Sequence, residues 1–387
     1  MIPDFPEFWQ FPLGDELVVA RPDVQGLFLL NGTASVVWEE YGSGAPLAEI
    51  AHTFSGLYSV PEAVARRDIE ATLANWSEGL LSSTFRGSPA HEEGLSRLRS
   101  LESSTQAVAI DCVLNGRGFR VWLEPGDLVE EIAPRLDKIA VPRLPADSLY
   151  LSFALVNGED RVFVFRDGLC IAEEEKTAAA RAILLQEITS HCDPGRETKA
   201  ILHAGACGTA TDCVILAGAS HAGKSTLCAA LMGRGFYCYS DDSAVLDREF
   251  RVGGMPFPVM VREESWPVLE SRVASFVERA PILQRWGFNV RFLPSNLPGS
   301  SSPSAPARAL MFVEYRPGSA AKLEPLSAFE ALLGLQQSGF WVEHNRESIG
   351  RFLAWIQRLG RYKLTYSRID DACDAVAGLL ADNGCEY

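Results

Sequence analysis

The sequence has few of the features that would place a protein in a membrane or on nucleic acid. No apolar run is long enough to span a bilayer, and residues 1–7 lack the basic and apolar regions of a signal peptide. Basic residues are in the minority, because 35 lysines and arginines face 50 aspartates and glutamates, a net charge of −15. We therefore expect a cytoplasmic protein with no membrane or nucleic-acid partner, whose acidity permits a neutral or basic peptide partner.

Paired cysteines are also missing. The nine cysteines include no C-x-x-C pair and no zinc-ligand spacing, and Cys213, Cys228 and Cys238 lie in apolar runs. Scattered cysteines of this kind are typical of reduced thiols in a protein core. An apolar content of 47% and a charged content of 22% are those of a globular protein, and 387 residues suggest two or three domains.

One stretch carries a clear chemical signal. The pattern G-x-x-x-x-G-K-[ST] is satisfied by Gly218, Ala219, Ser220, His221, Ala222, Gly223, Lys224 and Ser225, which Thr226 follows. Residues 214–217 predict a buried strand before it, and residues 227–232 predict a helix after it. Such a loop directs backbone N–H groups and a helix dipole at phosphate. We therefore expect residues 218–226 to bind ATP or another nucleoside triphosphate, with Lys224 on the β- and γ-phosphates and Ser225 on Mg²⁺.

Two adjacent acids follow the next apolar strand, predicted over 236–239. Asp241 and Asp242 suit the carboxylate site that a phosphate loop requires, with one carboxylate ordering Mg²⁺ and the other accepting the proton of an attacking hydroxyl. We assign Ser225 and Asp241 to the metal and leave open which aspartate is the base. The alternative is a helix cap or turn after a strand.

Three further residues have two interpretations each. His203 lies just before the loop strand, where it can orient an aspartate or serve as a structural histidine. His221 can contact phosphate or face solvent. Arg262 ends the apolar stretch 256–261, where it can bind phosphate or pair with Glu263 or Glu264.

Residues 1–85 predict one small domain. Strands over 17–20 and 26–30 precede a helix capped by Thr33 or Asn31 and two more helices over 45–54 and 61–79. This order predicts a winged-helix-like module.

Two segments separate this module from the phosphate-binding domain. Residues 86–106 are polar and turn-rich and predict a linker with one short helix. Residues 107–196 predict a small α/β subdomain without evident chemistry, with strand pairs 108–113 with 119–122 and 149–156 with 161–165, and helices 128–136 and 177–191.

The last domain spans residues 197–387. Strands are predicted over 214–217, 236–239, 244–246 and 309–313, and helices over 326–337, 349–359 and 369–381. Residues 294–306 are uncharged and rich in Pro, Ser and Gly, and predict a mobile loop. The expected class is α/β, or α+β when the whole chain is considered.

The phosphate-loop segment resembles the HPr serine kinase/phosphatase family. The resemblance rests on the histidine two residues before Gly205, the loop itself, the helix ending at residues 233–235 and the aspartate pair, and it covers 199–246 best. It implies a P-loop HPr-kinase/carboxykinase-like domain in which one of Asp241 and Asp242 is the general base, His203 supports it and Lys224 serves catalysis. His221-Ala222 replaces the glycine that usually follows the loop serine in that family. The phosphatase signature is not found, so kinase activity alone is expected. By analogy a homo-oligomer is possible.

The N-terminal module resembles PqqD, the recognition element of ribosomally synthesised and post-translationally modified peptide (RiPP) pathways. The similarity lies in residues 30–38, 47–51 and 68–81. It implies a precursor leader peptide added as a strand beside residues 26–30 and resting on the helix 61–79. The implied peptide-binding residues are Leu27, Phe28, Leu29, Leu30, Arg66, Ile69 and Leu73. A DNA-binding winged helix is disfavoured, because residues 1–85 hold twelve acids and three arginines.

The two resemblances together imply an ATP-dependent kinase that phosphorylates a serine or threonine hydroxyl of a RiPP precursor recruited through its leader, as in lasso-peptide precursor kinases. Two other functions stay open. One is a serine kinase acting on a folded carrier protein. The other is a nucleotide-dependent peptide chaperone or scaffold without phosphoryl transfer.

Overall fold

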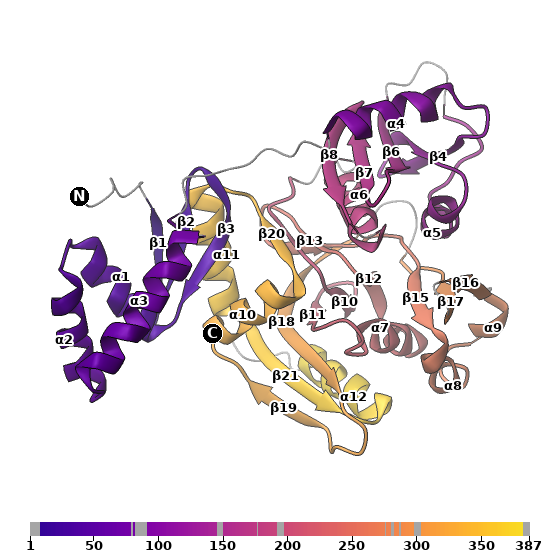
Figure 1. Cartoon of the computed structure of the whole chain (residues 1–387). Coiled ribbons are helices and arrows are strands. Elements are labelled where there is room, and N and C mark those ends of the chain that lie inside the picture. Colours follow the sequence, from indigo (N-terminus) through magenta and orange to yellow (C-terminus); the bar gives the residue numbers. More distant parts are fainter. Residues whose placement is uncertain are drawn as a thin grey trace. The chain divides into compact units, whose positions relative to one another are not determined.

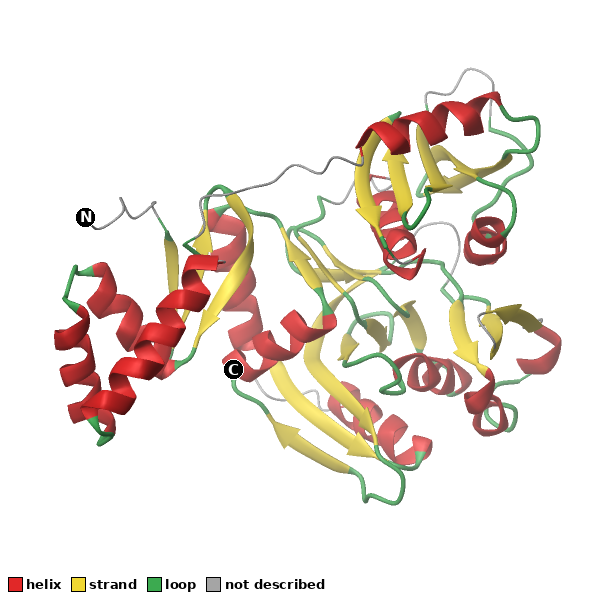
Figure 2. Ribbon diagram, in the orientation of Figure 1, coloured by secondary structure: helices red, strands yellow, loops and turns green. Residues whose placement is uncertain are grey.

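The computed structural model describes residues 8–78, 80–81, 91–144, 150–175, 177–191, 197–274, 276–279, 282–285, 288–297 and 303–381. The chain forms two compact units: residues 1–87 with 327–333 and 343–354, and the remainder. Helices and several sheets are mixed along the chain, as expected (Figures 1 and 2). Within the described residues, no helix has the length and apolar character that a membrane crossing demands.

The first unit begins with a three-stranded antiparallel sheet and three helices. These are β1 (Trp9–Leu13), β2 (Glu16–Arg21), β3 (Val24–Leu30), α1 (Gly32–Gly42), α2 (Leu47–Tyr58) and α3 (Glu62–Glu78). Asn31 is the cap of α1, because its side chain accepts a hydrogen bond from the Ala34 N–H at 2.9 Å. One face of the sheet packs against the helices, where Trp38, Ile50 and Ile69 are buried. The expected order of strands and helices is present, with β1 as an additional strand.

The other face of this sheet contacts residues far along the chain. The ring Nε2 of His344 lies 2.6 Å from the carbonyl oxygen of Arg21, and the His344 ring centroid lies 5.5 Å from that of Trp9. A Cβ atom at Gly350 would lie 3.4 Å from the Phe11 ring. Both faces of the sheet are therefore covered, and an additional strand can join it only at an edge.

The second unit starts with a small α/β subdomain. It consists of α4 (His91–Ser103), β4 (Val108–Leu114), β5 (Arg117–Leu123), α5 (Asp127–Leu136), β6 (Leu151–Asn157), β7 (Val162–Arg166), β8 (Leu169–Glu174) and α6 (Thr177–His191). The sheet order is β4-β5-β6-β7-β8, with α5 in the connection between the parallel strands β5 and β6. The predicted hairpin turn is confirmed by the positive φ angles of Asn115 (50°) and Gly116 (79°).

The segment 86–106 contains the one helix that was expected, α4, but this helix packs on the subdomain and is not part of a free linker. Leu98 and Leu101 are buried against Phe163 and Phe165 on one face of the sheet, whereas α5 and α6 cover the other face. Apolar residues spaced three apart along α4 give it a stripe to bury, and this outweighs the polar composition around it. Residues 82–90 lie outside the described residues.

The rest of the second unit is built around a large sheet. Its elements are β9 (Ala200–Leu202), β10 (Gly205–Gly208), β11 (Cys213–Ala217), α7 (Lys224–Gly233), β12 (Tyr237–Ser240), β13 (Ala244–Leu246), β14 (Arg251–Gly253), β15 (Val259–Arg262), the 3₁₀ turn η1 (Glu263–Ser265), α8 (Trp266–Leu269), α9 (Phe276–Arg279), β16 (Ile282–Arg285), β17 (Phe288–Leu293), β18 (Ser304–Tyr315), β19 (Lys322–Pro325), α10 (Ala328–Ser338), β20 (Phe340–Val342), α11 (Arg346–Arg358), β21 (Gly360–Tyr366) and α12 (Ile369–Ala381). The predictions over 244–246 and 369–381 match element bounds, and the other predicted strands and helices overlap observed ones.

The long strand β18 organises the large sheet. Its first residues pair with β14, and its later residues pair in parallel with β11 on one side and with β21 on the other. Met311 and Val313 are buried together with residues of α7 and α12. This arrangement fixes β11, and with it the start of α7, within the sheet.

The expectation of a loop over 294–306 is wrong at its C-terminal end. Residues 303–306 are described, and Ser304, Ala305 and Pro306 are paired with β14. Proline, serine and glycine indicate a loop from composition alone, but tertiary pairing here outweighs that tendency. Residues 298–302 lie outside the described residues.

Candidate functional site

The loop between β11 and α7 depends on two glycines. Gly218 and Gly223 have φ angles of 140° and 96°. A Cβ atom at Gly218 would lie 2.8 Å from the Val313 carbonyl oxygen, and one at Gly223 would clash with the Tyr366 hydroxyl. Both positions therefore require glycine. The chain then enters α7 at Lys224, which leaves the first N–H groups of the helix available to an anion.

The contact between Gly223 and Tyr366 gives a testable consequence. Gly223→Ala is expected to lower thermal stability, because the methyl group meets the Tyr366 hydroxyl and alanine disfavours this φ. The double variant Gly223→Ala/Tyr366→Phe removes the hydroxyl and should recover part of the loss. Differential scanning fluorimetry of both variants measures this. Equal stability of the single and double variants would show that the clash is not the cause.

Lys224 is held against its own loop. Its Nζ donates to the carbonyl oxygens of Gly218 at 2.7 Å and Ala219 at 3.2 Å, and the residue is 8% exposed. Burial lowers the pKa of Lys224, whereas the charges of Asp242 and Asp241 act in the opposite direction. A phosphate oxygen is a stronger acceptor than a carbonyl, so these donors are suited to transfer to a phosphate.

Asp241 lies beside Ser225 at the end of β12. Its Oδ2 accepts the Met260 N–H at 3.0 Å, while its Oδ1 is buried and has no hydrogen-bond partner among the described residues. Burial, followed by the charges of Cys228 and Asp242, raises the pKa of Asp241 to about 8, although the Ser225 hydroxyl favours the ionised form. An unsatisfied buried carboxylate oxygen next to a hydroxyl fits a hard cation such as Mg²⁺.

Asp242 has two basic neighbours. Its Oδ1 lies 3.4 Å from Nδ1 of His203, and its Oδ2 lies 3.5 Å from Nη2 of Arg181. The side chain keeps 33% of its surface exposed, so a substrate hydroxyl can approach it. The structure therefore brings His203 to the aspartate pair, as the sequence analysis expected.

The other loop candidates lie at the rim. Ala219, Ser220 and His221 are exposed, whereas Ala222, Ser225 and Thr226 are half-buried. Both ring nitrogens of His221 lie within 3.1 Å of Nη1 of Arg262, which places Arg262 next to the phosphate loop. The Thr226 hydroxyl contacts the Ser265 hydroxyl at 2.7 Å.

A cavity adjoins Ser225, Asp241 and Asp242, and the small α/β subdomain forms one of its walls. Arg135 from α5 and Arg181 from α6 line it, and both are more than nine-tenths buried. The sequence analysis assigned no chemistry to this subdomain and missed both arginines. No local motif contains them, because each lies in a helix whose charged positions resemble a solvated face.

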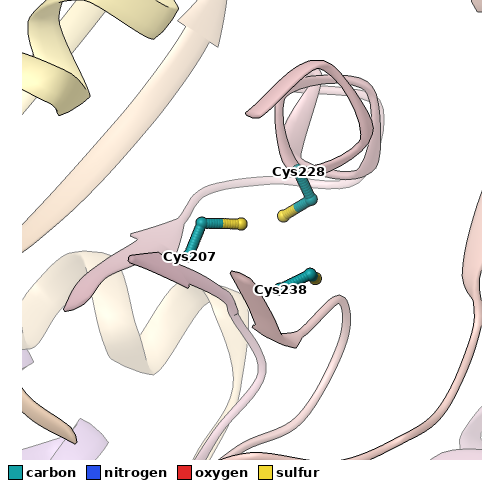
Figure 3. A group of neighbouring side chains, drawn as sticks. All are labelled: Cys207, Cys228 and Cys238. Carbon is teal, nitrogen blue, oxygen red and sulfur yellow. The ribbon is translucent and has the colours of Figure 1, made fainter. Parts of the chain in front are cut away.

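Three cysteines gather beneath the phosphate-loop helix. The sulfur atoms of Cys207 (β10), Cys228 (α7) and Cys238 (β12) lie within 4.8 Å of one another, and Figure 3 shows those of Cys207 and Cys228 facing each other. Hydrogen bonding to Cys228 and Cys238, together with burial, raises the pKa of Cys207 well above its ordinary value. A structural zinc site uses four deprotonated or neutral ligands, whereas this cluster offers three sulfur atoms. The cluster is part of the apolar core, in agreement with the expected reduced core thiols.

The peptide-binding candidates separate into edge and core residues. β3 is an edge of its sheet, and Phe28, Leu29 and Leu73 are half-buried. Arg66 is exposed and pairs with Glu70 at 3.0 Å. Leu27, Leu30 and Ile69, in contrast, are 9%, 4% and 1% exposed. These three side chains are therefore corrected to buried positions. Leu30 and Ile69 belong to the core between sheet and helices, whereas Leu27, three residues before Leu30 on β3, lies on the opposite face of the sheet, which is also covered.

Comparison with known proteins finds a family match for one part of the first unit. Residues 16–79, from β2 to the end of α3, match the family model of the coenzyme PQQ synthesis protein D (PqqD). No curated protein matches the chain. The N-terminal segment is therefore a PqqD-type RiPP recognition element, a domain that binds RiPP precursor peptides.

Proposed function

We propose that the chain is an ATP-dependent kinase that phosphorylates a serine or threonine hydroxyl of a RiPP precursor peptide. The observation that carries the proposal is the convergence of Ser225, Asp241 and Asp242 on one cavity next to a glycine-dependent loop, whose own carbonyl groups hold Lys224. A P-loop kinase domain joined to a peptide recognition element provides both the chemistry and the substrate.

The loop and Lys224 bind the triphosphate. Backbone N–H groups at the start of α7 face the phosphates, and Lys224 exchanges its two carbonyl acceptors for phosphate oxygens. Ser225 and Asp241 would hold Mg²⁺, which supplies charge neutralisation at the phosphates when bound. Asp241 would serve as a ligand in its deprotonated form, because only the carboxylate coordinates well.

Asp242 is the general base of this proposal. It lies at the cavity with part of its surface open to a substrate, and His203 fixes one of its oxygens. Asp241 is less suited to the role, because its Oδ2 is already bonded to the Met260 N–H and its Oδ1 is buried. The acceptor hydroxyl gives its proton to Asp242 as it attacks the γ-phosphorus.

The recognition element recruits the peptide by its leader. An added strand at the β3 edge would satisfy the backbone groups that this edge presents. Docking the leader raises the concentration of the attached core peptide around the kinase site without any new contact at that site. This role requires only that leader and core belong to one chain.

Leader removal is expected to have a large effect. With Mg²⁺ and ATP, the precursor peptide encoded beside this protein should gain a phosphate-sized mass in intact-mass spectrometry. The leaderless core should react about 10²- to 10⁴-fold less efficiently at low micromolar concentration. Saturating core peptide should recover much of the loss, since recruitment is its cause.

The controls separate recruitment from chemistry. A peptide with a scrambled leader should behave as the leaderless core does, and free leader added in trans should inhibit the intact precursor. Equal phosphorylation of all three peptides would contradict recruitment and favour a folded carrier protein as substrate. Tight leader binding with no mass gain on any neighbouring peptide would contradict the kinase and favour a scaffold.

A further inference from the structure

The cavity beside the aspartate pair contains a buried cationic group that the proposed chemistry has not yet used. Arg181, on α6, is 9% exposed. Its Nη1 lies 2.6 Å from Oε1 of Glu131, and its Nη2 lies 3.5 Å from Oδ2 of Asp242. Its Nε is buried with no hydrogen-bond partner among the described residues. A guanidinium is costly to bury with an unused donor, so this donor requires an explanation.

Arg135 strengthens the positive character of the same wall. It is 6% exposed, donates to the Glu131 carbonyl oxygen and lies over the Phe292 ring at 4.8 Å. Its Nη2 contacts the Met260 sulfur at 3.1 Å, which is a weak acceptor. Neither arginine of the wall therefore has all its donors matched by carboxylates.

The position of Arg135 and Arg181 in the cavity limits the kind of ligand that they can bind. Ser225, Asp241, Asp242 and Arg181 line one cavity, so a group that reaches the proposed metal ligands and base also comes close to Arg181. The planar guanidinium presents its donors in a fork that matches the oxygens of a phosphate. An anionic tetrahedral group is the chemistry that these donors recognise.

We infer that Arg181 is a catalytic residue that binds the γ-phosphoryl group of the nucleotide during transfer, with Glu131 and Arg135 as positioning residues. The inference rests on the proposed function. The acceptor oxygen forms its bond to the γ-phosphorus while the bond from that phosphorus to the β,γ-bridging oxygen breaks, and the electron pair leaves with ADP. The acceptor proton goes to Asp242. Arg181 keeps its protons and donates hydrogen bonds to the γ-phosphoryl oxygens.

This assignment gives the small α/β subdomain an active role. The helix α6 would supply in cis a charge that completes the kinase site, so the subdomain would be needed for chemistry as well as for folding. Glu131, whose side chain is fully buried, holds Arg181 in its rotamer. The loss of preorganised charge at a transferring phosphoryl group is costly to the rate.

The test compares two nucleotides on the full-length chain. Calorimetry would measure the affinities of ADP and of β,γ-imido-ATP, each with Mg²⁺, for wild type, Arg181→Gln and Arg181→Lys. Arg181→Gln is expected to weaken β,γ-imido-ATP binding about tenfold or more and to leave ADP binding unchanged. Phosphorylation of the precursor should fall about 10²- to 10³-fold. Arg181→Lys should recover only part of both losses, because it keeps the charge but not the fork.

Two controls account for effects on folding. Arg166→Gln removes an arginine that pairs with Glu187 of the same helix α6 but does not line the cavity, and it should leave both affinities unchanged. Glu131→Gln/Arg181→Gln removes both members of the buried pair, so it should fold better than Arg181→Gln alone and still lose the preference for β,γ-imido-ATP.

The outcomes separate this inference from the proposed function. If wild type binds neither nucleotide, the proposed function fails, and the inference fails with it. If wild type binds both nucleotides and phosphorylates peptide, and Arg181→Gln changes the two affinities equally or not at all, the inference alone is overturned. If Arg181→Gln loses only the γ-phosphate preference while no peptide is phosphorylated, the subsite stands and the kinase proposal does not.

Discussion

Replacing Lys224 with methionine is expected to reduce phosphoryl transfer to the precursor by about 10²- to 10³-fold while leaving leader binding unchanged. Methionine roughly preserves the volume of this buried side chain, so the loop should keep its shape. The change removes the ammonium group that we expect to bind the β- and γ-phosphates. Single-turnover phosphorylation and fluorescence anisotropy of a labelled leader measure the two effects.

Lys138 offers a matched control for this variant. Its Nζ also donates to two carbonyl oxygens, those of Ser295 at 2.9 Å and Leu297 at 3.3 Å, but Lys138 is exposed and lies outside the loop 218–226. Lys138→Met should therefore cost a comparable number of hydrogen bonds and leave the transfer rate near that of wild type. Equal rate losses in the two variants would mean that Lys224 acts on stability rather than on phosphate.

The second large effect is expected from Asp241→Asn, which should stabilise the protein at pH 8 while abolishing its activity. The folded pKa of about 8 lies above the ordinary value of 3.8, so the folded chain holds a proton that the unfolded chain has lost. Stability therefore falls as the pH rises from about 4 through 8. An asparagine does not ionise, so the variant avoids this loss.

The expected gain is largest in alkaline, metal-free buffer. Each pKa unit corresponds to about 1.4 kcal/mol, and because Asp241 is only partly buried as a residue, we expect about 3 kcal/mol between pH 5 and pH 8. For a unit of this size the melting temperature should rise by about 5 °C relative to wild type at pH 8, with little difference at pH 5. Thermal scans in EDTA at both pH values measure this difference.

Mg²⁺ and the neighbouring aspartate supply the controls. Mg²⁺ with nucleotide should raise the melting temperature of wild type more than that of Asp241→Asn, because only the carboxylate is a good ligand. Asp242→Asn should be destabilising, because it removes the carboxylate that contacts Arg181. A pH-independent effect of Asp241→Asn would contradict the assignment of a buried proton to this residue.

Local patterns in the sequence predicted much of the fold. The starts of helices, the Asn115-Gly116 turn and the phosphate loop are each determined by residues that are adjacent in sequence. The structure has a helix, a turn or a loop at or near each of these places. The strand β1 was missed because Pro12 argues against a strand, yet β1 is an edge of its sheet, where proline is tolerated. Pro306 also argues against a strand, yet it lies in β18 and pairs with Arg251 of β14.

The composition of the candidate site was less predictable. The loop and the aspartate pair come from contiguous residues, so a motif contains them. Arg181 lies 60 residues before Asp241 in the sequence. Nothing in the sequence of α6 indicates that the Arg181 side chain is buried and paired with Glu131. The cysteine cluster joins three elements whose spacing fits no ligand pattern. Such groupings depend on tertiary packing, which single-sequence patterns do not encode.

The pairing of β18 has a consequence for the order in which the chain can fold during synthesis. β11, which precedes the phosphate loop, is joined in parallel to β18 some 90 residues later, and β18 is joined to β21 still closer to the C-terminus. Contacts so distant in sequence form late. The strand pairing and the helices of the recognition element, in contrast, are local and leave the ribosome first, and only the cover on the other face of its sheet waits for residues near His344. A nascent chain can therefore form the sheet and helices of the recognition element well before β18 has been synthesised. Only then can β18 pair with β11 and fix the phosphate loop that follows it.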